Sequence, residues 1–203
     1  MITRRLVFAG TLALLVACLE RNAAPHAAAD APAAEPERAP VRSAGTAVSA
    51  DPELTATTGL GLRAKAAASG RKATIVNVWA SWCGSCKREI PMLLEVARGM
   101  EGEGVGLLLV SADEPKSRPL AVQLLREHGV ALPSLLLGEK VDAFAHALDP
   151  RWRGAIPATF LLDATGKPRY FWNGPVLAHE VAPIVQGLLA GEAIDGMTDY
   201  SAH

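Results

Sequence analysis

Residues 74–91 read TIVNVWASWCGSCKREIP, and this stretch decides the fold. Its first part, residues 74–80, is an apolar run rich in β-branched side chains, which predicts a buried β-strand. A helix is expected to follow over residues 84–100, so Cys83 and Cys86 lie where the strand passes into the helix. This placement matters more than the spacing of the two cysteines, because a helix N-terminus changes the chemistry of a thiol.

The predicted helix start favours a reactive first cysteine. Unpaired backbone N–H groups and the helix dipole stabilise an anion there, so a thiolate on Cys83, the reacting form of the thiol, is favoured. Cys86 follows one turn later on the same face, close enough to form a short disulfide. We therefore expect Cys83 to attack a partner's disulfide and Cys86 to resolve the mixed disulfide, with Cys83 the more exposed of the two.

A Cys-x-x-Cys pair also occurs in zinc sites and in structural disulfides. Zinc usually takes four ligands, but the chain has no second such pair and its histidines show no HxxxH spacing. A disulfide that closes a loop of two residues gains little chain entropy. Both alternatives stay open, but the pattern favours redox chemistry with no metal and no other cofactor.

The first twenty residues resemble an export signal. Two arginines precede an apolar run of 14 residues, 6–19, which is too short to span a bilayer comfortably. The run contains LVAC at residues 15–18, which resembles the lipobox of bacterial lipoproteins, whose cysteine is lipidated and becomes the new N-terminus after cleavage. We expect a signal peptide over residues 1–17, lipidation of Cys18 and attachment to a bacterial membrane outside the cytoplasm. An ordinary secretory peptide or an uncleaved anchor is the alternative.

Composition divides the rest of the chain. Residues 21–50 contain twelve alanines and four prolines but no aromatic residue, so they bury too little apolar surface to fold. We expect residues 18–52 to be the lipidated cysteine and a disordered linker, 53–191 a single domain, and 192–203 a C-terminal tail. The net charge of −1, from 20 basic and 21 acidic residues, gives no reason to expect nucleic-acid binding.

Periodicity and turn residues predict the other elements of an α/β domain with a mixed central sheet between helices. The turn-rich sequence DATGK at residues 163–167 suggests a hairpin. The expected helices are 54–69, 120–128, 141–147 and 176–190, and the expected further strands are 105–111, 134–137, 158–162 and 169–172.

Two segments carry a family resemblance. Residues 77–91 resemble the active-site region of TlpA/ResA-like thioredoxins, and residues 154–163, GAIPATFLLD, resemble the cis-proline segment of that family. The two motifs occur in the right order, and the resemblance covers roughly residues 70–190. It implies a thioredoxin-like fold and thiol–disulfide oxidoreductase activity.

The resemblance also implies roles for single residues. Pro157 would be the cis-proline, beside which Ile156 offers backbone hydrogen bonds to a substrate strand, and Trp82 would flank the site. Glu89 matches an acidic residue that could accept the proton of Cys86. Without the family, these residues would be a trans proline starting an edge strand, a core tryptophan and a solvated glutamate.

Two departures from the pattern weaken the analogy with cytoplasmic thioredoxin. Asn77 stands where thioredoxin has a buried aspartate, and Gly-Ser replaces the usual Gly-Pro between the cysteines. Asn77 cannot take the acid–base role of the aspartate, because an amide does not titrate. The dipeptide tunes the redox potential in this superfamily, so the analogy gives weaker support to a reductant.

The leading hypothesis is a periplasmic reductase of disulfides in exported proteins, kept reduced by a membrane thiol donor. The alternatives are an oxidase or isomerase with the same site, and a thiol-based metallochaperone.

Overall fold

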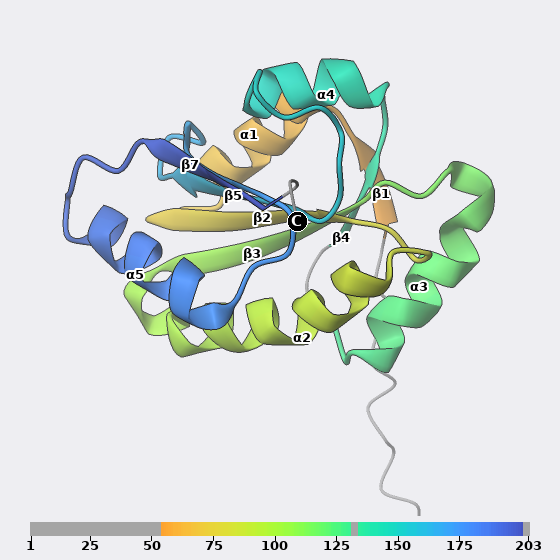
Figure 1. The fold of residues 1–203 in the computed structure, drawn as a ribbon, viewed down its shortest axis with the longest axis horizontal. Coiled ribbons are helices and arrows are strands. Elements are labelled where there is room, and N and C mark those ends of the chain that lie inside the picture. The colour runs from red at the N-terminus through yellow and green to blue at the C-terminus, as the bar shows by residue number, and fades with distance from the viewer. Residues whose placement is uncertain (1–53, 131–133, 201–203) are drawn as a thin grey trace, which may run out of the picture. The chain divides into compact units, whose positions relative to one another are not determined.

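The computed structural model describes residues 54–130 and 134–200 (Figure 1). The expected signal peptide, the lipidation site Cys18 and the linker up to residue 52 lie outside the described residues. None of the helices within these two stretches is long and apolar enough to cross a bilayer.

A seven-stranded mixed sheet forms the centre of the domain, in the order β1-β4-β3-β2-β5-β6-β7. Parallel pairs join β1, β4, β3 and β2, while β5 runs antiparallel to both β2 and β6. The strands are β1 (Leu54–Thr57), β2 (Ala73–Trp79), β3 (Val105–Ser111), β4 (Ser134–Leu137), β5 (Ala158–Asp163), β6 (Pro168–Asn173) and β7 (Gly196–Asp199).

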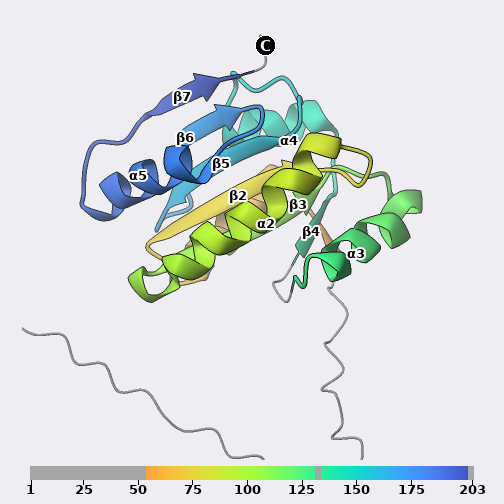
Figure 2. The same cartoon turned by 60° about the horizontal axis from the view of Figure 1, so that its bottom comes forward.

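Helices cover both faces of this sheet, as Figures 1 and 2 show. One apolar cluster packs α2, α3 and α5 on one face, and a second packs α1 and α4 on the other. The α-helices are α1 (Gly59–Ala68), α2 (Gly84–Gly99), α3 (Arg118–Glu127), α4 (Val141–Leu148) and α5 (Ala178–Leu189), with short 3₁₀ turns at Glu101–Glu103 and Pro115–Ser117. The expected α/β class with a mixed central sheet is therefore confirmed.

Strand β2 lies in the middle of the sheet and is buried along its whole length. Successive side chains point to opposite faces, so Ile75 joins one cluster and Val76 the other. Burial on both faces explains why this strand is an unbroken apolar run rather than an alternating one.

The first element differs from the sequence expectation of a helix over residues 54–69. Residues Leu54–Thr57 form strand β1, which pairs in parallel with β4, and α1 begins only at Gly59 after the N-cap Thr58. A Cβ at Gly59 would lie 2.6 Å from the Cβ of Ala147, so the glycine allows α1 to pack closely against α4. This glycine serves helix packing rather than interrupting a helix.

The expected tail over residues 192–203 also needs correction. Gly196–Asp199 forms the edge strand β7, which runs parallel to β6. Its short polar sequence carries little strand signal of its own, and side-chain bonds such as Tyr170 Oη to Thr198 Oγ1, at 2.9 Å, help to hold it in place. The other predicted elements are confirmed to within two residues at each end, including the β5–β6 hairpin.

Candidate active site

The topology brings the two sequence motifs to one edge of the sheet. Strand β2 ends at Trp79 and leads through a short loop into α2. Because β5 is antiparallel to β2, with Ala158 opposite Val78, the start of β5 lies beside the end of β2. The segment containing Pro157 therefore lies next to the segment that carries the cysteines.

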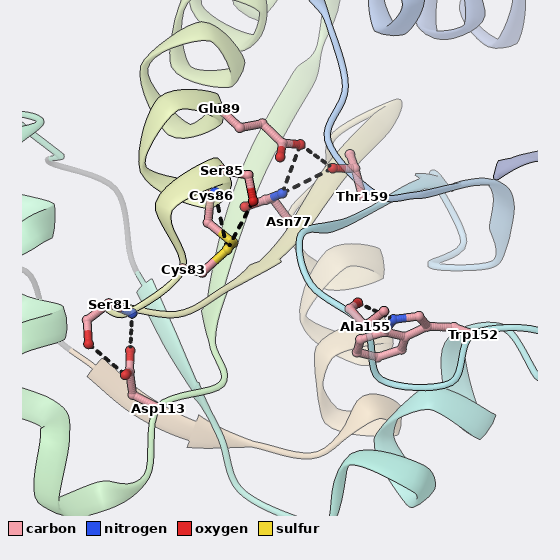
Figure 3. The surroundings of a disulfide bond; sticks show 10 residues. All are labelled: Asn77, Ser81, Cys83, Ser85, Cys86, Glu89, Asp113, Trp152, Ala155 and Thr159. Carbon is pink, nitrogen blue, oxygen red and sulfur yellow. Dashed lines mark hydrogen bonds between the residues drawn. A yellow bond between two sulfur atoms is a disulfide. The ribbon is translucent and has the colours of Figure 1, made fainter. Parts of the chain in front are cut away.

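Cys83 and Cys86 form a disulfide at the first turn of α2 (Figure 3). Cys83 is the N-cap residue of the helix, and its Sγ accepts the backbone N–H of Cys86 at 3.2 Å. The Oγ of Ser85 lies 3.4 Å from the same sulfur. A thiolate formed at Cys83 would therefore receive a backbone and a hydroxyl donor in addition to the helix dipole.

The two cysteines differ in exposure in the expected order, although the difference is small. Cys83 is 6% exposed and Cys86 is completely buried. The neighbouring Trp82 is 71% exposed, whereas Trp79 at the end of β2 lies wholly in the core. Trp82 is thus a large apolar side chain presented to solvent beside the first cysteine, and not the core aromatic that it would be without the family.

Glu89 is a buried acid one helical turn after Cys86. Its side chain is 4% exposed, and its Oε1 accepts hydrogen bonds from Thr159 Oγ1 at 3.0 Å and from Asn77 Nδ2 at 3.3 Å. Asn77 Nδ2 also lies 3.0 Å from Thr159 Oγ1, so the three side chains point toward one another from α2, β2 and β5 (Figure 3). The solvated position that Glu89 would occupy without the family is ruled out.

Burial controls the protonation of Glu89. Loss of solvent raises the pKa of this carboxyl from 4.5 to about 8, against the opposing effect of the hydrogen bond from Thr159. The backbone amide of Val176 also favours the charged form, while Oε2 has no hydrogen-bond partner within the described ranges. The carboxyl therefore holds a proton at neutral pH in the disulfide form.

Asn77 has a part in this site that the sequence comparison with thioredoxin concealed. Although Asn77 has no titratable group, the site still contains a buried acid. Glu89 supplies this acid from α2, and the amide of Asn77 donates a hydrogen bond to its carboxyl group. Thr159 was missed by sequence reasoning altogether. Only the register of the sheet, which sets Thr159 opposite Asn77, brings it into the site.

The Ile156–Pro157 peptide bond is cis, as the resemblance implies. Pro157 is buried and Ile156 is partly buried. The carbonyl of Pro157 accepts the backbone N–H of Gly174 at 3.0 Å, and Trp152 Nε1 donates to the carbonyl of Ala155 at 2.7 Å (Figure 3). The loop before β5 is thus fixed at both ends, and the hydrogen bond of the buried Trp152 is a contact that the sequence did not reveal.

Neither a metal-binding cluster nor the large hollow of the described domain involves the disulfide. No group of three or more His, Cys, Asp or Glu side chains that could hold a metal ion occurs in ranges 54–130 and 134–200. A hollow of about 920 Å³ is lined by residues such as Lys65, Arg71 and Arg98, and none of the predicted site residues lines it.

A disulfide at the N-terminus of the helix after the central strand, with a cis-proline beside it, defines a thioredoxin-like dithiol protein. Residues 49–171 match the model of the AhpC/TSA family, so the chain belongs to that family. A crystal structure of a thioredoxin-family thiol:disulfide interchange protein from Chlorobium tepidum shares the fold, with a TM-score of 0.51 and 24% identity over 68% of this chain and 94% of that one.

Curated relatives confirm the resemblance to the ResA type. The chain is 30% identical to thiol-disulfide oxidoreductase ResA of Geobacillus thermodenitrificans, over 54% of this chain and 59% of the relative. It is 33% identical to thiol:disulfide interchange protein DsbE of Allochromatium vinosum, over 59% of this chain and 63% of the relative. The match thus spans less than two thirds of the length of either relative.

Proposed function

We propose that the chain is a thiol–disulfide oxidoreductase that reduces disulfides of exported proteins through Cys83 and Cys86. The observation that carries the proposal is the disulfide at the N-terminus of α2, with a buried acid one turn beyond it. The names of the ResA and DsbE relatives support the same chemistry.

In the reduced protein, the thiolate of Cys83 attacks one sulfur of the partner's disulfide. The partner's S–S bond breaks, and the departing sulfur leaves as a thiolate that takes a proton from water. The helix N-terminus and the N–H of Cys86 stabilise the attacking thiolate. The exposed ring of Trp82 and the backbone of Ile156, next to Pro157, would contact the partner chain around the two sulfurs.

In the second step, Cys86 gives its proton to Glu89 and attacks the Sγ of Cys83. The mixed disulfide breaks, and the second partner sulfur leaves as a thiolate. Two electrons have then passed to the partner, and the Cys83–Cys86 disulfide and a protonated Glu89 remain. The raised pKa of Glu89 in the disulfide form supports this assignment, because the carboxyl that has taken the proton retains it.

The N-terminal sequence supports the proposed location. A signal peptide over residues 1–17 and lipidation at Cys18 would place the protein in the periplasm on a bacterial membrane. A membrane thiol donor would return the disulfide to the dithiol. The replacement Cys18→Ser should move the protein from the membrane fraction to the soluble fraction, and continued membrane attachment would contradict the lipid anchor.

Insulin reduction with dithiothreitol as donor tests the mechanism. Cys83→Ser should abolish the reaction, and Cys86→Ser should accumulate a mixed disulfide between Cys83 and the partner. Cys18→Ser, which removes the remaining cysteine of the chain, is the matched control and should reduce insulin at the rate of the unaltered protein. Activity retained by Cys83→Ser would rule out the mechanism.

A specific contact favours the opposite direction of electron flow as a second candidate. A hydrogen bond from Ser85 Oγ stabilises the thiolate of Cys83, and a stabilised reduced form makes a stronger oxidant. Equilibration in redox buffers decides between the two directions. A reduction potential near roughly −270 mV would indicate a reductant, and one near roughly −120 mV an oxidase.

A further inference from the structure

Asp113 is a buried carboxylate that the mechanism does not use. It follows β3, is 3% exposed, and has no cationic partner among residues 54–130 and 134–200. A buried carboxylate is costly unless other groups replace its hydration. Here three hydrogen bonds do so, from Ser81 N at 2.8 Å, Ser81 Oγ at 2.7 Å and Ser111 Oγ at 2.9 Å.

Two of these three bonds fasten the loop that carries the cysteines (Figure 3). Ser81 lies in the loop between β2 and α2, two residues before Cys83. The backbone hydrogen bonding between β2 and β3 continues one residue past β3, because Ala112 N donates to Trp79 O at 2.7 Å. Asp113 is thus fixed beside the loop and holds Ser81 by its backbone N–H and its hydroxyl at once.

Apart from Asp113, the loop is held at its two ends, by the buried Ala80 and by the buried Cys83, whose carbonyl accepts the N–H of Lys87 at 3.2 Å. Trp82 is 71% exposed, so its packing does not hold the backbone. The amide of Cys83 donates to the carbonyl of Ala80 at 3.1 Å, which closes a turn inside the loop but does not attach it to the sheet. In the oxidised protein the disulfide also ties Cys83 to Cys86, and reduction removes that bond.

We propose that Asp113 is a positioning residue that acts through Ser81 to keep Cys83 at the N-cap of α2 in the dithiol form. The proposal rests on the proposed function, since it concerns the reactivity of the reduced site. The carboxylate itself does not touch the reacting sulfurs. Its effect is to hold the loop so that Cys83 Sγ stays over the N–H of Cys86, where the thiolate is stabilised.

Alkylation of Cys83 by iodoacetamide in the reduced protein, followed at that residue by mass spectrometry, measures this effect directly, because Cys18 and Cys86 are then counted separately. At pH 7, Asp113→Ala should lower the second-order rate constant by about three- to ten-fold and move the midpoint of the pH–rate profile upward. Loss of the negative charge alone would act in the opposite direction, because removal of a nearby carboxylate favours a thiolate. A slower reaction therefore reports lost positioning.

Two further variants separate geometry from charge. Asp113→Asn can accept the N–H of Ser81 with its oxygen and donate to the Ser81 hydroxyl with its amide, so it should react within two-fold of the unaltered protein. Ser81→Ala loses only the hydroxyl bond and keeps the bond from its backbone N–H to the carboxylate, so its rate should fall between those of Asp113→Ala and the unaltered protein. It also provides a test if Asp113→Ala does not fold.

A matched control exists at the β5–β6 turn. Asp163 Oδ1 accepts the N–H and the hydroxyl of Thr165 at 2.9 and 2.6 Å, which is the same pair of donors that Ser81 offers. Asp163 pairs with Ala73 at the start of β2, about 20 Å from the end that leads to Cys83. Asp163→Ala and Thr165→Ala should therefore leave the alkylation rate unchanged.

The outcomes distinguish this proposal from the proposed function. The proposal fails if the alkylation rate constant of Asp113→Ala is within two-fold of that of the unaltered protein, or if Asp163→Ala lowers this rate constant equally. Asp113 would then only complete the end of β3. Both results are independent of insulin reduction. If the unaltered protein alkylates rapidly but does not reduce insulin, the proposed function fails while the positioning role of Asp113 stands.

Discussion

The replacement Glu89→Gln should change how stability depends on pH. Glu89 has a pKa of about 8 in the folded disulfide form and an ordinary value of 4.5 when unfolded. Because the folded value is the raised one, the stability associated with the proton is complete below pH 4.5 and is lost as pH rises toward 8. Between those values the unfolded chain ionises while the folded protein does not, so the free energy of unfolding falls by up to about 1.4 kcal/mol per pH unit.

Between pH 5 and pH 8 the loss from this one group amounts to about 3 to 4 kcal/mol. Glutamine has nearly the same shape and can still accept the bonds from Thr159 and Asn77, but it does not ionise. Urea unfolding of the oxidised proteins at pH 5, 6, 7 and 8 should therefore show the variant gaining this amount relative to the unaltered protein as pH rises.

The matched control is Glu95→Gln, at an exposed position of the same helix. A surface change of this kind should alter the free energy of unfolding by no more than about 0.5 kcal/mol at each pH. If the difference between Glu89→Gln and the unaltered protein were the same at pH 5 and pH 8, Glu89 would not hold a proton in the folded site. The assignment of Glu89 as the proton acceptor for Cys86 would then be wrong.

Three further changes have defined expectations. Gly59→Ala should destabilise the protein by about 1–3 kcal/mol in urea unfolding, because the new methyl group meets α4, whereas Gly99→Ala meets no atom within 4 Å and should not destabilise it. Ser85→Ala should lower the reduction potential by about 30 mV in redox-buffer equilibration, through loss of a donor to the Cys83 thiolate; an unchanged potential would show that the hydroxyl does not bond the thiolate. Trp82→Ala should leave the free energy of unfolding within about 0.5 kcal/mol, since the ring is exposed, while slowing insulin reduction; equal rates would exclude the ring from partner contact.

The two ends of the site are held by different means. The cysteine loop is fastened by Asp113 from the end of β3, and the cis-proline loop by Trp152 and Gly174. Between them, the proposed mechanism moves only a pair of sulfurs and one proton. A thiol exchange needs little movement of the backbone, so rigid loops on both sides suit it.

Local sequence was sufficient for the central strand, the helix start and the cysteine pair. An apolar β-branched run followed by Cys-Gly-Ser-Cys specifies strand, turn and helix through interactions between near neighbours in the chain. The hairpin at residues 163–167 was predictable for the same reason, since turn residues act on their own backbone. The cis-proline came from the resemblance and not from the residues alone.

The tertiary structure decided the features that depend on distant partners. Residues 54–57 form a strand because β4, eighty residues later, offers its edge, and the strand preference of Thr55 and Thr57 is too weak to decide this over four residues. Residues 196–199 likewise become a strand only beside β6. Pairing energy from another part of the chain exceeds the weak local preference of such short segments.

The same distinction applies to the acid in the site. The sequence by itself placed Glu89 three residues after Cys86 and so on the same helical face, but helical spacing does not show whether that face meets water or protein. The docking of β5, with Thr159 seventy residues away, buries the carboxyl and raises its pKa. Position along the chain is set by local bonds, whereas solvation is set by whatever the fold packs against the side chain, and the protonation of Glu89 follows its solvation.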